Sequence, residues 1–128
     1  MKFTANCVTW QTHDDVAMLG FADDEFNTTQ YVILQKDLLP SQQDLQLGHD
    51  KPYIEIGDQR YSSFGGVVKA QLQENQLVLK LDAIAATNMS VDDIIEIAFH
   101  LSKERLKEAG NQLRLLLGND IVQADANI

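Results

Sequence analysis

A period of two is the feature that most constrains the fold of this chain, because several short runs alternate apolar residues with polar ones. In QLVLKLD, residues 76–82, every second residue is a leucine. Successive side chains of a strand point to opposite faces of a sheet, so this spacing predicts strands with one buried face. Further runs that are alternating or continuously apolar lie at 3–7, 16–21, 31–35, 53–56 and 67–73.

Turn-forming residues separate these runs. Residues 22–29 are rich in Asp, Asn and Thr, which bond locally to the backbone and favour turns. Glu74 and Asn75 lie between the last two runs, and Asn tolerates the positive φ of tight hairpins, so we predict a hairpin there. Apolar residues at strand spacing favour a further strand within 91–101, although a helical reading of this segment stays open.

The apolar period changes near the C-terminus. Ser102 is suited to cap the start of a helix, and Gly118 is suited to end it. Between them, apolar residues recur at three- and four-residue steps, at Leu106, Ala109, Leu113 and Leu116. We therefore predict an α+β fold, a mostly antiparallel sheet of about six to seven strands with one long C-terminal helix packed on one face.

The chain has the length of one domain. Its 128 residues can bury a core without a disulfide or a metal, so we predict a single domain over 1–128. Segment 38–52 contains both prolines and no clear period, which makes it the longest predicted loop unless it contains a short helix. Residues 118–128 also lack a period, and we expect a flexible tail or a segment laid along the surface.

The N-terminal region and the single cysteine bear on cellular location. Cys7 lies in an apolar alternation that predicts a small buried thiol, and a lone cysteine cannot form a disulfide within the chain. Residues 1–15 lack the apolar run of a signal peptide, and no segment approaches the roughly 20 apolar residues of a membrane span. These features favour a cytoplasmic protein that does not bind membranes.

The charge is strongly negative. Nineteen Asp and Glu residues oppose ten Lys and Arg residues, which gives a formal net charge of -9. Nucleic-acid binding depends on cationic contacts to phosphate, and this chain has no basic run, so we expect no direct nucleic-acid binding. The charge fits a basic protein partner, but it is equally explained by solubility alone.

The sequence contains no metal or cofactor motif. The residues His13, His49 and His100 are isolated from one another and from the cysteine, which argues against a zinc site. The acidic triplet 23–25 lacks the alternating oxygen ligands of a calcium loop. No glycine-rich turn is followed by Lys and Ser or Thr, so a phosphate loop is also absent. We expect no cofactor.

The strongest case for an enzyme combines Glu55 and Asp58 with His49, because two carboxylates with different pKa values can divide acid and base roles. The spacing favours another reading, in which Glu55 lies on the polar side of a half-buried strand and Asp58 in the following turn. Ser62 and Ser63 lack the glycine-flanked elbow of a serine nucleophile. A small enzyme or ligand-binding module around Glu55 and His49 remains the alternative.

The pair Gly65 and Gly66 also has two readings. The structural one is a β-bulge or a close approach of a neighbouring group, such as the ring of Phe64 or Tyr61. The functional one is a surface shaped for a partner. The structural reading is favoured.

Three segments resemble the immunity protein 10 family of bacterial polymorphic-toxin systems. They are YVILQKD (31–37), DKPYIEIGDQRYSSFGGV (50–67) and LQENQLVLKLD (72–82). The resemblance implies a small cytoplasmic α+β protein that binds and inactivates a toxin, as in contact-dependent growth inhibition, and that is not an enzyme. The implied partner is the C-terminal domain of a cognate toxin.

The resemblance and the charge together suggest where that partner binds. Toxins of this kind are frequently nucleases with basic clefts, which an acidic inhibitor can occlude after steered association. We expect a monomer or weak dimer. A third reading of the sequence, a homodimeric structural protein that pairs exposed strand edges, stays open. The residues predicted to bind the partner are charged or aromatic groups of two turns and one strand: Asp23, Asp24, Glu25, Glu55, Asp58, Arg60 and Tyr61.

Overall fold

The computed structural model describes residues 1–125 and 128. In chain order its elements are β1 (Lys2–Thr4), β2 (Cys7–His13), β3 (Val16–Ala22), β4 (Tyr31–Asp37), α1 (Gln42–Leu47), β5 (Tyr53–Ile56), β6 (Ser62–Phe64), β7 (Val67–Leu72), β8 (Gln76–Leu81), α2 (Ala83–Met89), β9 (Ile94–Ala98), α3 (Lys103–Leu117) and β10 (Val122–Ala124). The α+β class predicted from the sequence is confirmed.

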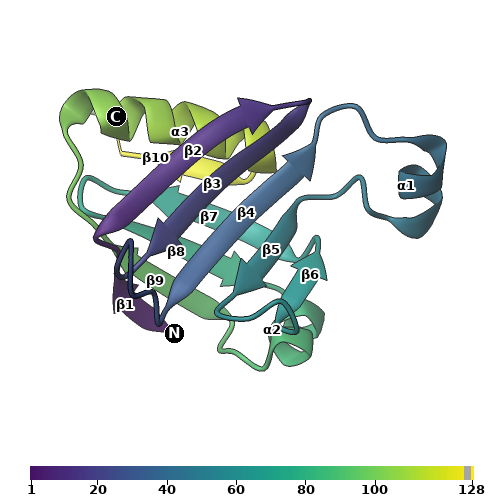
Figure 1. Cartoon of the computed structure of the whole chain (residues 1–128), viewed down its shortest axis with the longest axis horizontal. Coiled ribbons are helices and arrows are strands. Elements are labelled where there is room, and N and C mark those ends of the chain that lie inside the picture. Colours follow the sequence, from purple (N-terminus) through teal and green to yellow (C-terminus); the bar gives the residue numbers. More distant parts are fainter. Residues whose placement is uncertain (126–127) are drawn as a thin grey trace.

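The strands form two five-stranded sheets instead of the single larger sheet that we expected. Sheet A has the order β1-β9-β8-β7-β10, and sheet B has the order β2-β3-β4-β5-β6. Sheet B is antiparallel throughout, whereas the edge strands β1 and β10 join sheet A in parallel. Sheet B lies in front of sheet A in Figure 1, so the two sheets form the layers of the molecule.

The division between the sheets begins at Asn6. The chain leaves sheet A after Ala5, whose N–H donates to the carbonyl of Ala98, and enters sheet B at Cys7. This crossing shifts the alternation by one residue, so that Val8 is buried and Cys7 is only half-buried. A one-residue shift moves side chains to the other face of a strand. The expected burial of the Cys7 thiol was therefore wrong.

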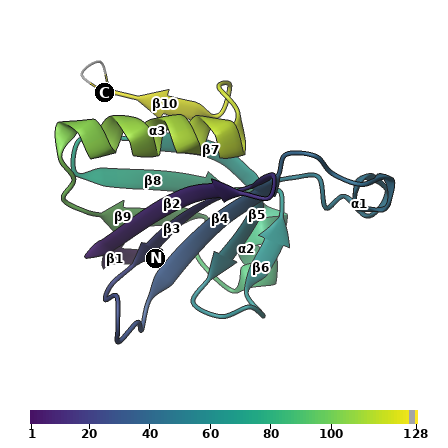
Figure 2. The same cartoon turned by 45° about the horizontal axis from the view of Figure 1, so that its top comes forward.

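Helix α3 packs against both sheets. It contacts β3 and β4 of sheet B and β10 of sheet A, and Figure 2 shows it alongside β10. The Ser102 hydroxyl accepts a hydrogen bond from the Arg105 N–H at 3.2 Å, and the helix ends at Gly118, as predicted. The predicted apolar stripe is buried: Leu106, Ala109, Leu113 and Leu116. The helix thereby closes the core along one side of the two layers.

Several local predictions are confirmed. The segment 91–101 contains the strand β9, and β7 and β8 form the predicted hairpin, closed by a hydrogen bond from the Gln73 N–H to the carbonyl of Gln76. The loop 38–52 contains the short helix α1. A strand was not predicted in the segment 118–128, but residues 122–124 form β10, which pairs in parallel with β7.

The double glycine has the structural role that the sequence favoured. Gly65 and Gly66 have φ values of 84° and 100°, and a register shift follows between Val67 and Lys69. The close neighbour of Gly66 is Ala85 of α2 and not an aromatic ring. The Gly66 carbonyl also accepts a hydrogen bond from the N–H of Asp82, the residue that caps α2. The backbone at Gly66 therefore allows α2 to pack closely against the start of β7.

Candidate functional site

One face of sheet B is left uncovered. Buried and less buried residues alternate along its three central strands, and the buried ones face sheet A and α3. Figure 1 shows no helix or strand in front of the opposite face, which we call the outer face of sheet B. At one end it is bordered by two turns, one between β3 and β4 and the other between β5 and β6. At the other end it is bordered by the segment around α1, which we call the projecting arm.

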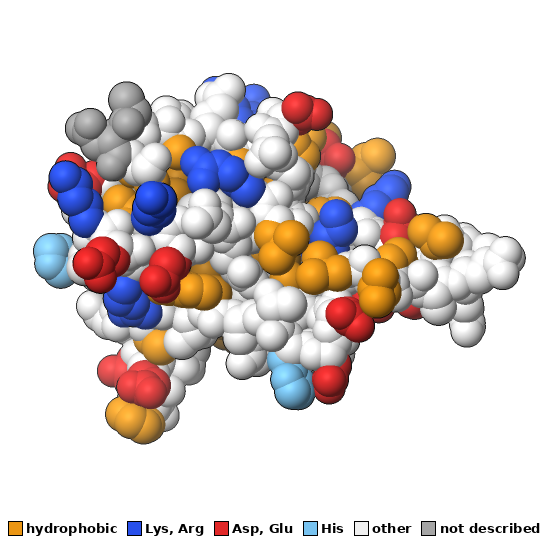
Figure 3. Space-filling model, turned by 90° about the horizontal axis from the view of Figure 1, so that it is seen from above, with side chains coloured by type: hydrophobic (Ala, Val, Ile, Leu, Met, Phe, Trp, Pro, Cys, Tyr) orange, Lys and Arg blue, Asp and Glu red, His pale blue; other side chains and the backbone are white. Residues whose placement is uncertain are grey.

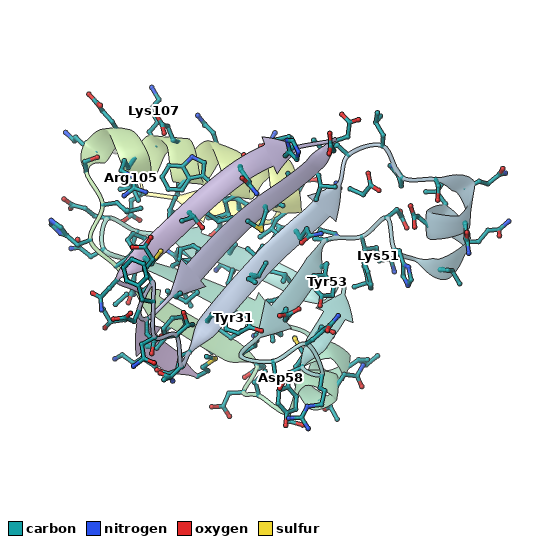
Figure 4. The ribbon with its side chains drawn as sticks, viewed as in Figure 1. Tyr31, Lys51, Tyr53, Asp58, Arg105 and Lys107 are labelled. Carbon is teal, nitrogen blue, oxygen red and sulfur yellow. The ribbon has the colours of Figure 1, made fainter. Side chains whose placement is uncertain are left out.

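Glu55 lies on this face between two tyrosines. The Tyr31 hydroxyl donates to Oε2 at 2.5 Å, and the Tyr53 hydroxyl donates to Oε1 at 2.6 Å. The two tyrosines come from the neighbouring strands β4 and β5 (Figure 4). Both oxygens of the carboxylate are thus held in place, and none of the ion pairs found among the described residues involves Glu55.

The hydrogen bonds to Glu55 change the acidity of the tyrosines. Donation to the carboxylate, together with burial and the charge of Glu55, raises the pKa of Tyr31 to about 12. Burial raises the pKa of Tyr53, and its hydrogen bond to Glu55 acts in the same direction. Both phenols therefore stay protonated over the physiological range and serve as donors.

A groove separates the outer face of sheet B from the projecting arm. Its volume is about 530 Å³, and Tyr53, Glu55, His49 and Lys51 are among the residues that line it. The His49 ring stacks on the Phe64 ring, with centroids 4.2 Å apart and planes 16° apart. The structure therefore places Glu55 and His49 in the lining of one groove.

The projecting arm is the segment around α1. Locally made caps define this helix: Ser41 and Asp44 form a capping box, and Gly48 adopts a left-handed conformation at the other end. None of the six helical residues is buried. Three leucines of the arm are exposed by more than half: Leu39, Leu45 and Leu47. Figure 3 shows apolar side chains on and beside this segment.

The turn between β5 and β6 holds three of the predicted partner-binding residues. The Arg60 N–H donates to Oδ1 of Asp58 at 2.9 Å, and the Arg60 side chain pairs with the same carboxylate at 3.2 Å. These contacts lower the pKa of Asp58. The Arg60 guanidinium also lies over the ring of Tyr61, 5.5 Å from its centroid. Asp58 is therefore already paired with a cation.

The turn between β3 and β4 holds the acidic triplet. The Asp23 carboxylate accepts hydrogen bonds from the N–H and hydroxyl of Thr29, which lower its pKa to about 2. Asp24 accepts hydrogen bonds from the N–H groups of two following residues. These two carboxylates shape their own loop, whereas Glu25 and Phe26 are exposed, and Phe26 is 91% exposed.

The two turns lie at the same end of sheet B. The Gly57 N–H, at the start of one turn, donates to the carbonyl of Tyr31, which follows the other turn, at 3.0 Å. Asp58 and Tyr31 are accordingly near that end in Figure 4. The structure thus brings the predicted residues of the two turns, 23–25 and 58–61, to one edge of the outer face, beside Glu55.

Sequence reasoning missed a second depression on the outer face. This hollow has a volume of about 350 Å³, and Gly20 and Ile33 are among the residues that line it. The signal for it was the glycine inside the apolar run 16–21, because a glycine within a strand often marks a close approach by another group. The exposed leucines of the arm were also missed, because their side chains follow no period.

The described part of the chain contains no cluster of three or more His, Cys, Asp or Glu residues that could hold a metal ion. No helix among those residues is long and apolar enough to cross a membrane.

The fold and the face define a class: a small two-sheet α+β protein with an uncovered sheet face bordered by charged turns and an apolar arm. The chain belongs to the immunity protein 10 family, because the sequence profile of that family matches residues 4–107. This match covers all of sheet B and confirms the resemblance found in the sequence. No curated protein sequence matches the chain significantly.

Proposed function

We propose that this protein is an immunity protein that binds a cognate bacterial toxin domain and blocks its active site in a one-to-one complex. The observation that carries this proposal is the family match over residues 4–107. The uncovered face of sheet B supports it, because such a face presents a wide surface whose side chains are not needed for the core. The protein acts in this proposal by binding and not by catalysis.

The charge indicates the kind of toxin. A net charge of -9 favours a basic partner, and a nuclease with a basic cleft for nucleic acid is a partner of this kind. Opposite fields accelerate the encounter of two proteins and align them before contact. We therefore propose a basic nuclease domain, such as those of contact-dependent growth inhibition, met by a monomeric or weakly dimeric inhibitor in the cytoplasm.

The proposed contact surface is the end of sheet B that carries the two turns. Glu25 and Phe26 project from one turn and offer an exposed charge beside an exposed ring. On the other turn, the Arg60 guanidinium lies over the ring of Tyr61, so that turn offers a cation beside an aromatic ring. Aromatic and arginine residues are enriched among those that contribute most to protein interfaces.

The groove supports a second candidate function, a small-ligand module around Glu55 and His49. Its volume of about 530 Å³ lies within the range of ligand pockets, about 300–1,000 Å³. The ligand module and the immunity protein differ in the molecule that they bind. A ligand module would bind a small molecule in the absence of any toxin, whereas the immunity protein would bind only the toxin domain.

Coexpression tests the proposed function. Cells that express the toxin domain encoded beside this protein should stop growing, and growth should return when this chain is coexpressed. Calorimetry with a catalytically inactive toxin domain should give one-to-one binding. Failure to bind and to restore growth would contradict the immunity function for that pair. Saturable binding of a small metabolite to Tyr53 and Glu55 without toxin would favour the second candidate.

A further inference from the structure

Gly20 is a glycine that the fold does not need. It lies in the central part of β3, its φ is outside the left-handed region, and a β-carbon there would meet only the Thr9 hydroxyl oxygen, at 3.5 Å. Any residue could adopt this backbone. Glycine inside a strand is destabilising relative to alanine, because it loses more conformational freedom on folding, so its presence here lowers stability without a steric reason.

The absent side chain leaves a hollow on the outer face of sheet B. Gly20 pairs with Thr9 on one side and with Ile33 on the other, and both belong to the lining of the hollow. Most of the remaining lining is apolar: Cys7, Met18, Ala22 and Tyr31. The hollow has a volume of about 350 Å³ and is open to water. Filling it with an apolar side chain of a partner removes apolar surface from water, which favours binding.

Glu55 adds a charge beside this hollow. Tyr31 lines the hollow and donates to one oxygen of Glu55, while Tyr53 lines the groove on the other side and donates to the second oxygen. The carboxylate is therefore held rigidly between the two depressions. When a partner covers this half-buried carboxylate, a cation must compensate its charge. Among the described residues, no cation forms an ion pair with it.

We infer that the outer face of sheet B receives a segment of the toxin that places an apolar side chain in the hollow over Gly20 and an arginine or lysine side chain against Glu55. This inference rests on the proposed function and names the chemistry of the partner. Arginine fits best, because its planar guanidinium can bind both oxygens of a carboxylate that is already fixed in orientation.

A second copy of this chain is a poorer occupant of the same face. Two copies would each bring a net charge of -9 to the contact, so the two like-charged molecules would repel each other. A basic toxin supplies the missing positive charge. If the wild type did dimerise through this face, a variant that fills the hollow would be monomeric.

Filling the hollow tests the apolar half of the inference. Gly20→Leu should fold at least as stably as the wild type, because it removes a strand glycine, yet its Kd for the inactive toxin domain should rise at least about tenfold. Gln71→Leu is the matched control, since it adds the same side chain to a half-buried position of β7 on sheet A. Its Kd should equal that of the wild type.

Removing the charge tests the other half. Glu55→Gln should raise the Kd for the inactive toxin domain by about tenfold or more, whereas Glu96→Gln, a half-buried glutamate of β9 on sheet A, should not. A toxin-free measurement uses N-acetyl-arginine methylamide as a probe. By NMR it should shift the ring signals of Tyr31 and Tyr53, and the neutral glutamine analogue should not.

The outcomes separate this inference from the proposed function. If the wild type binds toxin and restores growth, but Gly20→Leu and Glu55→Gln bind as tightly as it does, the inference is wrong and the immunity function stands. If the wild type does not bind the toxin, both are wrong. Equal weakening by the sheet A control variants would also overturn the inference, because the effect would not be specific to this face. A dimer of the wild type that Gly20→Leu abolishes would assign the face to a second copy and overturn it as well.

Discussion

Gly66 lies directly against Ala85: a β-carbon at Gly66 would lie 2.3 Å from the β-carbon of Ala85. This contact joins the start of β7 to α2, and the positive φ of Gly66 adds a second reason for glycine at this position. The first prediction follows from the two constraints together.

Gly66→Ala should lower the free energy of unfolding by about 2–4 kcal/mol, because alanine must adopt a left-handed backbone and also displace α2. Gly57→Ala is the matched control. Gly57 has a φ of 70° but no atom within 4 Å of a β-carbon, so it should cost only about 1 kcal/mol. Chemical denaturation measures both. Equal losses would show that the contact with Ala85 adds nothing.

The second prediction concerns the docking of α3. Leu113 is 1% exposed in the core and Leu115, two residues later on the same helix, is 44% exposed. Leu113→Ala should cost about 2–5 kcal/mol of unfolding free energy, whereas Leu115→Ala should change it by less than about 0.5 kcal/mol. The two substitutions remove the same atoms, so a similar loss at both positions would contradict the observed orientation of the helix.

The third prediction uses the hydrogen bond from Tyr31 to Glu55. The pKa of Tyr31 is raised to about 12 in the folded protein from an ordinary value of 10.0. The folded state therefore holds this proton more tightly, so its contribution to stability is full below about pH 10 and is lost as the pH rises toward 12. Ultraviolet titration of the tyrosines should show the high pKa.

Glu55→Gln should lower that pKa, because the hydrogen bond to the carboxylate is the largest cause of the shift. The loss of stability in alkaline solution should still begin near pH 10, but it should be complete at a lower pH and be smaller. Glu96→Gln, on the other sheet, should leave the titration unchanged. A tyrosine titration that is the same in Glu55→Gln and the wild type would mean that the Tyr31 hydroxyl does not bond to Glu55.

Much of this fold could be predicted because the spacing of apolar residues within single elements indicates strands and helices. The leucine alternation in 76–82 and the three- and four-residue steps in α3 each report a buried face, and the strand β9 and the cap at Ser102 were found by the same reasoning. A period of two tells which face of a strand is buried, but not which strand lies beside it. The division into two sheets therefore could not be predicted.

Two of the elements that were missed have no buried period of their own. The helix α1 has six residues and none is buried, so no apolar stripe could reveal it. The strand β10 has three residues and depends on its pairing with the distant β7. Similarly, the polar composition of the turns predicted part of the candidate site, but the bonds of Glu55 to Tyr31, 24 residues away, arise only from strand pairing.

The fourth prediction uses the only cysteine as a reporter of the proposed interface. Cys7 is half-buried and lines the hollow over Gly20. Bound toxin should slow the reaction of this thiol with N-ethylmaleimide at least about tenfold, because the reagent must reach the thiolate. Protein modified at Cys7 should bind toxin weakly. Cys7→Ser should have the same affinity for toxin before and after treatment with the reagent, whereas full reactivity of Cys7 in the saturated complex would place the toxin elsewhere.

The last prediction tests the electrostatic part of the proposed function. If the acidic protein attracts a basic toxin over a distance, the association rate should fall steeply as salt rises, since the Debye length is only about 8 Å near physiological ionic strength. Dissociation should change much less, because it depends on contacts already formed. Stopped-flow kinetics at several salt concentrations measure both rates.

Glu25→Gln tests whether the turn between β3 and β4 contributes to the electrostatic attraction of the toxin. Its side chain is exposed at the turn between β3 and β4, and, unlike Asp23 and Asp24, it holds no bond of that loop among the interactions of the described residues. We expect it to slow association by about twofold at low salt and to leave dissociation nearly unchanged. Glu74→Gln, an equal change of charge in the exposed hairpin turn of sheet A, is the control. If both variants slow association equally, only the net charge steers the toxin; if neither does and the wild-type rate is independent of salt, binding is not steered by charge at all.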